Sequence, residues 1–236
     1  MAHRRYPRIS LFPLAEYVFA PAGRRWKIVC DHADPPDQVV PLYRLTRNAA
    51  RAFLRSGAQD RRALDQAIAD LETRESSSAW TERDLRYSAA ALRHLANVRS
   101  VDFGERIVNT KGRGLMSIGG TIVSVNPAVA VYGRSGVGAV ALHFGKSRVL
   151  REQEAAVAAT ILRCYVAEKL DVSMDSVPAD LCQVVDVWRE RSFVAPASYK
   201  QRLRRVGESC REIARLWPHV QDEPGAQPEP QPSPLH

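Results

Sequence analysis

The sequence lacks several features that would assign a chemistry directly. Its four cysteines, Cys30, Cys164, Cys182 and Cys210, form no Cys-x-x-Cys pair, so zinc-ribbon, thioredoxin-like and clustered iron–sulfur sites lose their main support. The chain contains no uncharged apolar run of about 18 residues, and we therefore expect no membrane-spanning helix. A Gly-x-Ser-x-Gly motif is also absent, which removes the usual sign of a hydrolase nucleophile.

Two glycine-containing segments lack the pattern of nucleotide-binding loops. Gly145-Lys146-Ser147 has the ending of a P-loop, but Val140 stands where the first glycine belongs and residues 137–144 are strand-like. Backbone amides in a strand cannot curl around a phosphate. The segment Gly133-x-x-Gly136-x-Gly138 lies between two strand-like runs without a helix directly after it, so it is not a dinucleotide-binding fingerprint.

The residues that are present give an ordinary globular composition with a basic excess. The 236 residues are 45% hydrophobic and 25% charged, enough to bury a core in one large domain or two small ones. Lys and Arg number 34, of which 29 are Arg, against 26 Asp and Glu. Because Arg binds phosphate at two points, we expect DNA or RNA as the partner. The alternative is that GC-rich bacterial coding favours Arg and the surplus only aids solubility.

Apolar periodicity predicts an N-terminal helical region over residues 1–98. Helices are expected over residues 12–19 after an N-cap at Ser10, and over 41–56, 60–74 and 81–96. Residues 26–30 could form a short strand or continue a helix. Residues 31–37 read as a loop whose Asp-His-Asp spacing could bind a metal, although we favour a capped turn.

From residue 99 the pattern changes to short β-like runs, which predict an α/β core over residues 99–217. The turn Gly133–Gly136 joins runs 128–132 and 137–144 as a hairpin. Helices over 150–170 and 198–217 and a strand pair over 182–188 and 192–194 follow. We expect one mixed sheet over residues 101–195, sandwiched by these two helices, with the N-terminal helical region packed on it.

The tail over residues 218–236 is predicted to be disordered. It contains six prolines in 19 residues, three acids and no Lys or Arg, so the rest of the chain carries +11. A proline-rich acidic tail could dock on a protein partner or fold back on the basic body, but an inert tail is the simplest interpretation.

We also expect a cytoplasmic protein. The cysteines mostly lie among apolar neighbours, as reduced buried thiols do. His3-Arg4-Arg5 and the apolar residues after it loosely imitate a signal peptide, but Glu16 interrupts the apolar stretch.

The segment Ile9–Arg25, ISLFPLAEYVFAPAGRR, resembles the opening of RecB-like nucleases of the PD-(D/E)XK superfamily. Five residues match the family pattern: Leu14, Tyr17, Pro21, Arg24 and Arg25. Ala20 replaces the Cys that binds a cluster in iron–sulfur members. The later order of elements is also similar, with a helical insert, β-runs, a hairpin, a helix, a strand pair and a terminal helix. The resemblance implies a restriction-endonuclease-like core with an Mg²⁺ site in its hairpin.

The carboxylates that this resemblance implies are missing. The family carries an Asp on one strand and Asp/Glu-x-Lys on the next, whereas here Asn126-Pro127-Ala128 and residues 139–142 fall at these positions. The following helix lacks the family's Gln-x-x-x-Tyr, because Gln153 is followed by Val157. Residues 107–149 contain no Asp or Glu, yet Mg²⁺ prefers carboxylate oxygens. We therefore expect a fold that has lost its catalytic carboxylates and binds no cofactor.

These observations favour a non-catalytic nuclease-fold protein that binds nucleic acid through arginine-rich helical faces. The expected phosphate contacts are Arg44, Arg47, Arg51 and Arg55 on one helix, and Arg202, Arg204 and Arg205 on the last.

The sequence leaves two alternatives to nucleic-acid binding without catalysis, and it gives one histidine a structural role. The first alternative is an Mg²⁺-dependent DNA nuclease with migrated carboxylates, for which the candidate residues are Lys146, Glu152, Glu154, Asp102 and Glu105. The second is a protein–protein adaptor that acts through the tail. His143, between two apolar residues of a strand, is expected to be structural.

Overall fold

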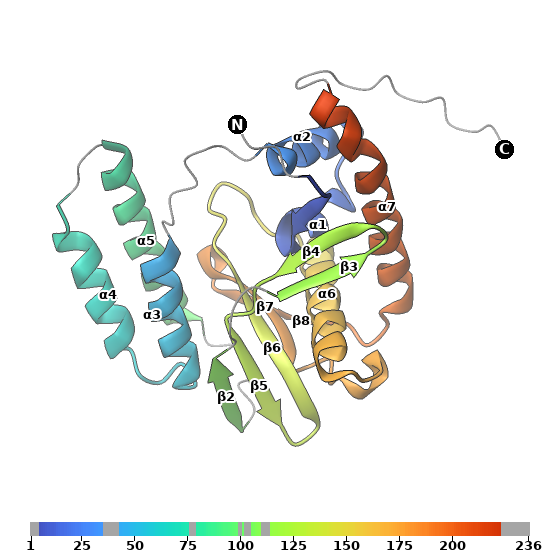
Figure 1. Cartoon of the computed structure of the whole chain (residues 1–236). Helices are drawn as coiled ribbons and strands as arrows, with labels where there is room; N and C mark the ends of the chain where they lie inside the picture. The colour runs from blue at the N-terminus through green and yellow to red at the C-terminus, as the bar shows by residue number, and fades with distance from the viewer. Residues whose placement is uncertain are drawn as a thin grey trace.

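The structure is a computed structural model that describes residues 5–34, 43–75, 79–98, 101, 105–109 and 114–222. Across these residues the chain forms an α/β fold of seven α-helices and two sheets (Figure 1). None of the helices in this part of the chain is long and apolar enough to cross a membrane.

The N-terminal elements are β1 (Arg8–Ser10), α1 (Leu11–Tyr17), α2 (Ala22–Ala33), α3 (Tyr43–Arg55), α4 (Arg62–Thr73) and α5 (Ala79–Asn97). The elements that follow are β2 (Arg106–Asn109), β3 (Gly114–Ile118), β4 (Thr121–Val125), β5 (Val129–Gly133), β6 (Gly136–His143), α6 (Glu152–Leu170), β7 (Cys182–Asp186), β8 (Arg191–Val194) and α7 (Lys200–Asp222). Two 3₁₀ turns, η1 (Met174–Ser176) and η2 (Val187–Arg189), flank β7.

Most predicted helices and strands are confirmed, and the first differences lie near the N-terminus. Residues 26–30 are helical and belong to α2. The loop predicted from residue 31 is wrong for residues 31–33, which end α2, while residues 35–37 lie outside the described residues. Ser10 stands at the N-cap of α1 but makes no side-chain capping bond, and its backbone pairs in β1 with β4.

The main sheet has the strand order β2-β5-β6-β7-β8 and is mixed, as predicted. Among its described strands, β6 and β7 are parallel, and the other neighbouring pairs are antiparallel. The prediction of a single sheet is wrong, because β3 and β4 form a second sheet with β1. Asn126-Pro127 separates β4 from β5, and proline cannot donate to a strand ladder, so the chain leaves one sheet there and enters the other.

Two hydrophobic cores cover the two faces of the main sheet. One joins the sheet to α1, α2, α6 and α7, and the other joins it to α3, α4 and α5 (Figure 1). Along β6, Ala139 and Ala141 enter the first core and Val140 enters the second. The prediction that α6 and α7 sandwich the sheet is therefore wrong, because both helices lie in the same core. A strand buried on both faces reads as a continuous apolar run.

The β3–β4 hairpin is anchored on α7. Its turn residues Gly119 and Gly120 have φ of +53° and +81°, a combination that suits a tight two-residue hairpin turn. A Cβ on Gly119 would lie 2.8 Å from the carbonyl oxygen of Gly207, so the turn requires glycine on close-packing grounds as well. The buried Thr121 hydroxyl donates to the Cys210 carbonyl oxygen over 2.7 Å.

Helix α7 is longer than predicted. It continues through Pro218 to Asp222, so the predicted disorder is wrong for residues 218–222. Burial of Trp217 and Val220 in the first core explains this extension. Residues 223–236 lie outside the described residues, and the adaptor hypothesis that rests on them stays a prediction.

Close packing between β6 and the residue before β7 gives a stability prediction. A Cβ on Gly138 would lie 2.1 Å from the carbonyl oxygen of Leu181. We expect Gly138→Ala to lower the free energy of unfolding by about 3 kcal/mol through overpacking. Gly23→Ala is the matched control, because nothing lies within 4 Å of that Cβ and a helical alanine should add about 0.5 kcal/mol. Urea denaturation followed by circular dichroism measures both, and a Gly138→Ala variant as stable as the parent would contradict this packing.

Candidate functional site

The candidate site lies where β6 and β7 end and β5 begins. His143 and Asp186, the last residues of these parallel strands, are opposite each other in the register. The amide of Ala128, just before β5, donates to the Val140 carbonyl oxygen over 2.7 Å. We call this border, formed by residues 126–128, 143–150 and Asp186, the strand-end edge. Ligands of α/β sheets bind at the carboxyl ends of parallel strands. The strand-end edge is therefore the candidate binding site.

The start of β5 carries an amide and an arginine instead of a carboxylate. Asn126 accepts a hydrogen bond at its Oδ1 from Arg51 Nη2 over 3.4 Å. Arg51 comes from the middle of α3 and is half-buried. Its guanidinium brings a fixed positive charge to the strand-end edge. This positive charge disfavours the binding of a metal cation. The guanidinium also has further N–H groups that can donate hydrogen bonds to a phosphate.

A histidine–aspartate pair closes the other side of this edge. His143 Nδ1 lies 4.0 Å from Asp186 Oδ1, and the Asp186 side chain is 1% exposed. The His143 ring packs on Phe12 of α1 with centroids 4.8 Å apart. Gly145 leaves room for this ring, since a Cβ there would lie 2.7 Å from its Cε1. His143 is thus held by packing, as expected for a structural histidine, and it faces an acid.

Asp186 also fixes the loop that follows β6. Its Oδ2 accepts a hydrogen bond from the Leu150 amide over 3.3 Å. Burial disfavours the charged carboxylate, but the His143 side chain and the Leu150 amide outweigh it and hold the pKa of Asp186 below its ordinary value. The ionised carboxylate therefore ties residues 143–150 to the end of β7.

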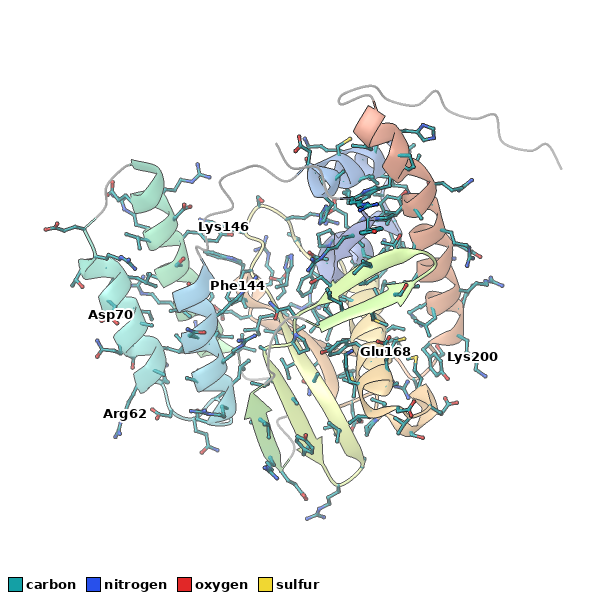
Figure 2. All side chains as sticks on the ribbon, viewed as in Figure 1. Arg62, Asp70, Phe144, Lys146, Glu168 and Lys200 are labelled. Atoms are coloured by element: carbon teal, nitrogen blue, oxygen red, sulfur yellow. The ribbon has the colours of Figure 1, made fainter. Side chains whose placement is uncertain are left out.

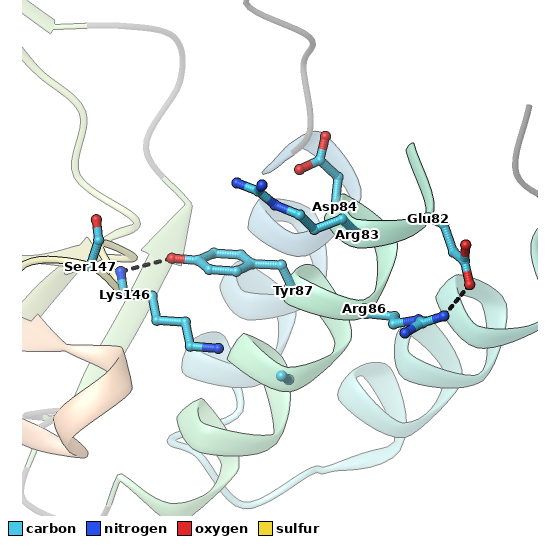
Figure 3. Close-up of a pocket in the computed structure, with 8 residues that line it drawn as sticks. Glu82, Arg83, Asp84, Arg86, Tyr87, Lys146 and Ser147 are labelled. Carbon is cyan, nitrogen blue, oxygen red and sulfur yellow. Dashed lines mark hydrogen bonds and ion pairs between the residues drawn. The ribbon is translucent and has the colours of Figure 1, made fainter. Parts of the chain in front are cut away.

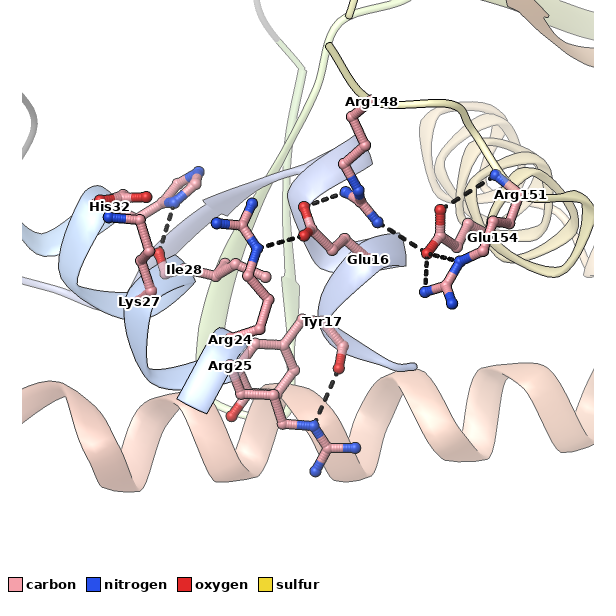
Figure 4. A network of polar contacts seen from close by, with 11 residues as sticks. Glu16, Tyr17, Arg24, Arg25, Lys27, Ile28, His32, Arg148, Arg151 and Glu154 are labelled. Carbon is pink, nitrogen blue, oxygen red and sulfur yellow. Dashed lines mark hydrogen bonds and ion pairs between the residues drawn. The ribbon is translucent and has the colours of Figure 1, made fainter. Parts of the chain in front are cut away.

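Five charged residues form a continuous network beside this loop (Figure 4). They are Arg24, Glu16, Arg148, Glu154 and Arg151, and together we call them the arginine–glutamate network. Arg24 Nε lies 2.6 Å from Glu16 Oε1, and Arg148 binds both glutamates, with its Nη2 2.8 Å from Glu154 Oε1. Three cations thus neutralise two carboxylates.

Glu154 is the buried centre of the network. Its side chain is 0% exposed, and its Oε1 accepts from Arg151 Nε over 2.7 Å. Its Oε2 accepts from the Arg151 backbone amide over 3.2 Å, and this bond caps the start of α6. Both oxygens of this carboxylate are therefore already engaged, and they cap a helix.

The other proposed nuclease residues do not surround a common point. Glu152 is exposed on the first turn of α6, and Lys146 is exposed on the turn after β6. Glu105 pairs with Arg134 over 2.8 Å near the β5–β6 turn, and Asp102 lies outside the described residues. In the part of the chain that the structure describes, no three His, Cys, Asp or Glu side chains are placed to hold a metal ion. The residues at the strand-end edge thus do not fit an Mg²⁺ site.

The two arginine series that the sequence singles out lie on different flanks of the molecule. On α3, Arg47 and Arg55 are exposed and Arg51 reaches Asn126, while the Arg44 side chain is not among those described.

On α7, Arg202 donates to the Ser198 carbonyl oxygen over 2.6 Å, Arg204 lies 3.8 Å from Glu208, and Arg205 is exposed. The two helices belong to separate cores, with the sheets between them (Figure 1). The described arginines of the two series therefore do not line a shared groove.

A pocket of about 980 Å³ opens next to the strand-end edge, between α5 and the turn after β6 (Figure 3). Its lining residues are Glu82, Arg83, Asp84, Arg86, Tyr87, Ala90, Lys146 and Ser147. Figure 2 shows Phe144 and Lys146 between the α3–α5 layer and the rest of the fold, far from Lys200 at the start of α7. Lys146, which the sequence offers as a catalytic candidate, thus lines this pocket. The contact of its loop with α5 could not be predicted from the sequence.

The comparisons with known proteins add no relative. No family model matches this chain, and no curated protein matches its sequence. Function must therefore be inferred from the strand-end edge, the arginines of α3 and the pocket.

The sequence prediction missed the His143–Asp186 and Arg51–Asn126 contacts. In both cases the partners lie far apart in sequence, by 43 and 75 positions. A signal for the first was available, since each residue is a polar side chain that directly ends an apolar strand. If the two strands are parallel neighbours, such residues meet.

The lowered pKa of Asp186 gives a prediction with a defined pH dependence. A depressed folded-state pKa means that the ionised carboxylate stabilises the fold above the ordinary Asp value of 3.8, and that this contribution disappears as the pH falls through the folded-state pKa. Asp186→Asn should therefore lower the free energy of unfolding at pH 7 by on the order of 1 kcal/mol. The difference from the parent should shrink in acid.

The matched control is Asp70→Asn, an identical charge change on the exposed side of α4, which should alter stability by less than about 0.5 kcal/mol. Urea denaturation at neutral and acidic pH measures all three proteins. A deficit of Asp186→Asn that is the same at both pH values would contradict the role of the ionised carboxylate.

Proposed function

We propose that this protein has a restriction-endonuclease-like core without catalytic activity and binds nucleic acid at the strand-end edge. The order of elements supports this fold assignment. The hairpin β5–β6 is followed by α6, the strands β7 and β8, and α7, which is the order that the resemblance to RecB-like nucleases implies. The five strands of the main sheet also lie side by side in chain order.

The observation that carries the functional proposal is the contact between Arg51 and Asn126. The resemblance implies a metal-binding Asp where Asn126 stands, and the structure has a guanidinium within 3.4 Å of that side chain. In a metal-dependent nuclease, the cation both attracts the phosphodiester and activates water. An arginine can supply the first effect through charge-assisted hydrogen bonds, but it cannot supply the second. Binding without cleavage follows from this exchange.

The arginines of α3 extend this positive charge. Arg47 and Arg55 lie one turn before and one turn after Arg51 on the same helix, and a step of four residues corresponds to a rise of about 6 Å. The three residues thus cover roughly 12 Å of helix, enough to face several phosphates of a strand. Because phosphate neutralisation releases counterions, binding should weaken steeply as salt is added.

Paired arginine variants test which flank binds. Arg51→Ala/Arg55→Ala should weaken binding about tenfold or more in low salt. It should also make the dependence of log affinity on log salt concentration shallower, by the amount that about two phosphate contacts contribute. Arg204→Ala/Arg205→Ala removes the same charge from α7 and should change affinity much less. Fluorescence anisotropy with DNA and RNA oligonucleotides, on variants shown to be folded, measures both.

Equal losses from the two double variants would mean that only net charge matters. No binding by the parent at micromolar protein in low salt would end the proposal.

Cleavage assays test the absence of catalysis. We expect plasmid and single-stranded DNA to remain intact with Mg²⁺ or Mn²⁺, because Glu16 and Glu154 are held by arginines and the hairpin carries no carboxylate. Glu152 is the exposed acid that lies nearest in sequence to the β5–β6 hairpin. Metal-dependent cleavage that disappears in a folded Glu152→Ala variant would instead establish the nuclease with migrated carboxylates.

A further inference from the structure

The pocket between α5 and the turn after β6 contains a lysine whose ammonium lies beside two aromatic rings. The Lys146 Nζ lies 5.1 Å from the centroid of the Trp188 ring and 5.8 Å from that of Tyr87. Among the ion pairs of the described residues, none involves Lys146, whereas Arg86 in the same pocket is paired with Glu82. A cation–π contact at an exposed site contributes only about 0.5–1 kcal/mol. A phosphate, which offers charge-assisted hydrogen bonds, can therefore attract this ammonium away from the rings.

The aromatic floor below Lys146 is held in place by hydrogen bonds. The Tyr87 hydroxyl donates to the Phe144 carbonyl oxygen over 2.9 Å and accepts from the Lys146 amide over 2.7 Å. Trp188 Nε1 donates to the same carbonyl oxygen over 2.8 Å, and the Tyr87 and Trp188 centroids are 4.7 Å apart. Tyr87 thus lines the pocket beside Lys146 in an orientation that hydrogen bonds and ring packing fix.

A ligand that uses both features carries an anionic group next to a flat aromatic ring. Nucleotides have this combination, and a base stacked on an aromatic side chain contributes about 1–3 kcal/mol. The pocket volume of about 980 Å³ is at the upper end of the range for small-molecule sites, roughly 300–1,000 Å³, so one nucleotide fits. Bases outnumber acids among the lining residues by three to two, which favours an anion.

On this basis, and resting on the proposed function, we propose that the pocket holds one unstacked nucleotide of a single-stranded nucleic acid. Its phosphate binds the Lys146 ammonium, and its base stacks on Tyr87. Lys146 and Ser147 belong to the loop of the strand-end edge, so a strand bound along that edge can place one nucleotide in the pocket. A duplex cannot, because its bases are paired and stacked. The inference therefore makes the protein selective for single strands.

The experiment compares four ligands on the full chain. Fluorescence anisotropy measures a single-stranded oligonucleotide, its duplex, and an abasic strand of equal length, and saturation-transfer NMR measures adenosine 5′-monophosphate. Lys146→Ala should weaken binding of the base-carrying single strand by about tenfold, and it should weaken binding of the duplex and of the abasic strand clearly less, because these two lose only a phosphate contact at the edge. The matched control is Lys169→Ala, because Lys169 Nζ also lies over a tyrosine ring, 5.6 Å from the Tyr165 centroid, but on α6 away from the pocket.

The outcomes separate the pocket from the proposed function. Equal affinity of parent and Lys146→Ala for the single strand, or an equal loss for all three polymers, overturns the pocket and leaves nucleic-acid binding intact. No polymer binding, together with Lys146-dependent binding of the mononucleotide, overturns the proposed function and retains a nucleotide pocket. Binding of neither ligand class overturns both.

Discussion

The arginine–glutamate network is the interaction on which the strand-end edge depends. Glu154 is fully buried and Glu16 nearly so, and buried carboxylates are tolerated only when they are paired and hydrogen-bonded. Arg148 joins the two glutamates, so the loop after β6 is fixed at once to α1 and to the start of α6. Asp186 holds the same loop from β7 through the Leu150 amide. Glu16, Glu154 and Asp186 thus act together to position this loop.

Part of the fold could be predicted because its signals are local. Apolar periodicity located α3, α4 and α5, and the Gly133–Gly136 turn located the β5–β6 hairpin. The second sheet could not be predicted, since β1 has only three residues and pairs with β4, which lies more than 100 residues later. The face of the sheet that α6 and α7 cover could not be predicted either. Strand β6 is buried on both faces, so its apolar run does not show which helices pack on which face.

For the candidate site, the sequence showed that the metal-binding carboxylates are missing, but it did not show which side chains stand in their place. The carboxylate-free stretch 107–149 is evident from sequence, as is the arginine series that includes Arg51. That Arg51 meets Asn126 depends on how α3 packs against the sheet, and no local pattern encodes this. Glu154 shows how much depends on three-dimensional contacts: its place after the hairpin suggested a migrated ligand, and in the structure it caps α6 and is bound by two arginines.

Amide hydrogen exchange of the full chain, with and without a bound single-stranded oligonucleotide, tests most directly whether this edge is the binding site. The account predicts slower exchange in peptides that cover residues 144–150 and α3, because the strand contacts the loop and the arginines beside it. Peptides from residues 200–217 of α7 should exchange at the same rate in both states. Protection confined to α7, with residues 144–150 unchanged in the complex, would contradict the central claim.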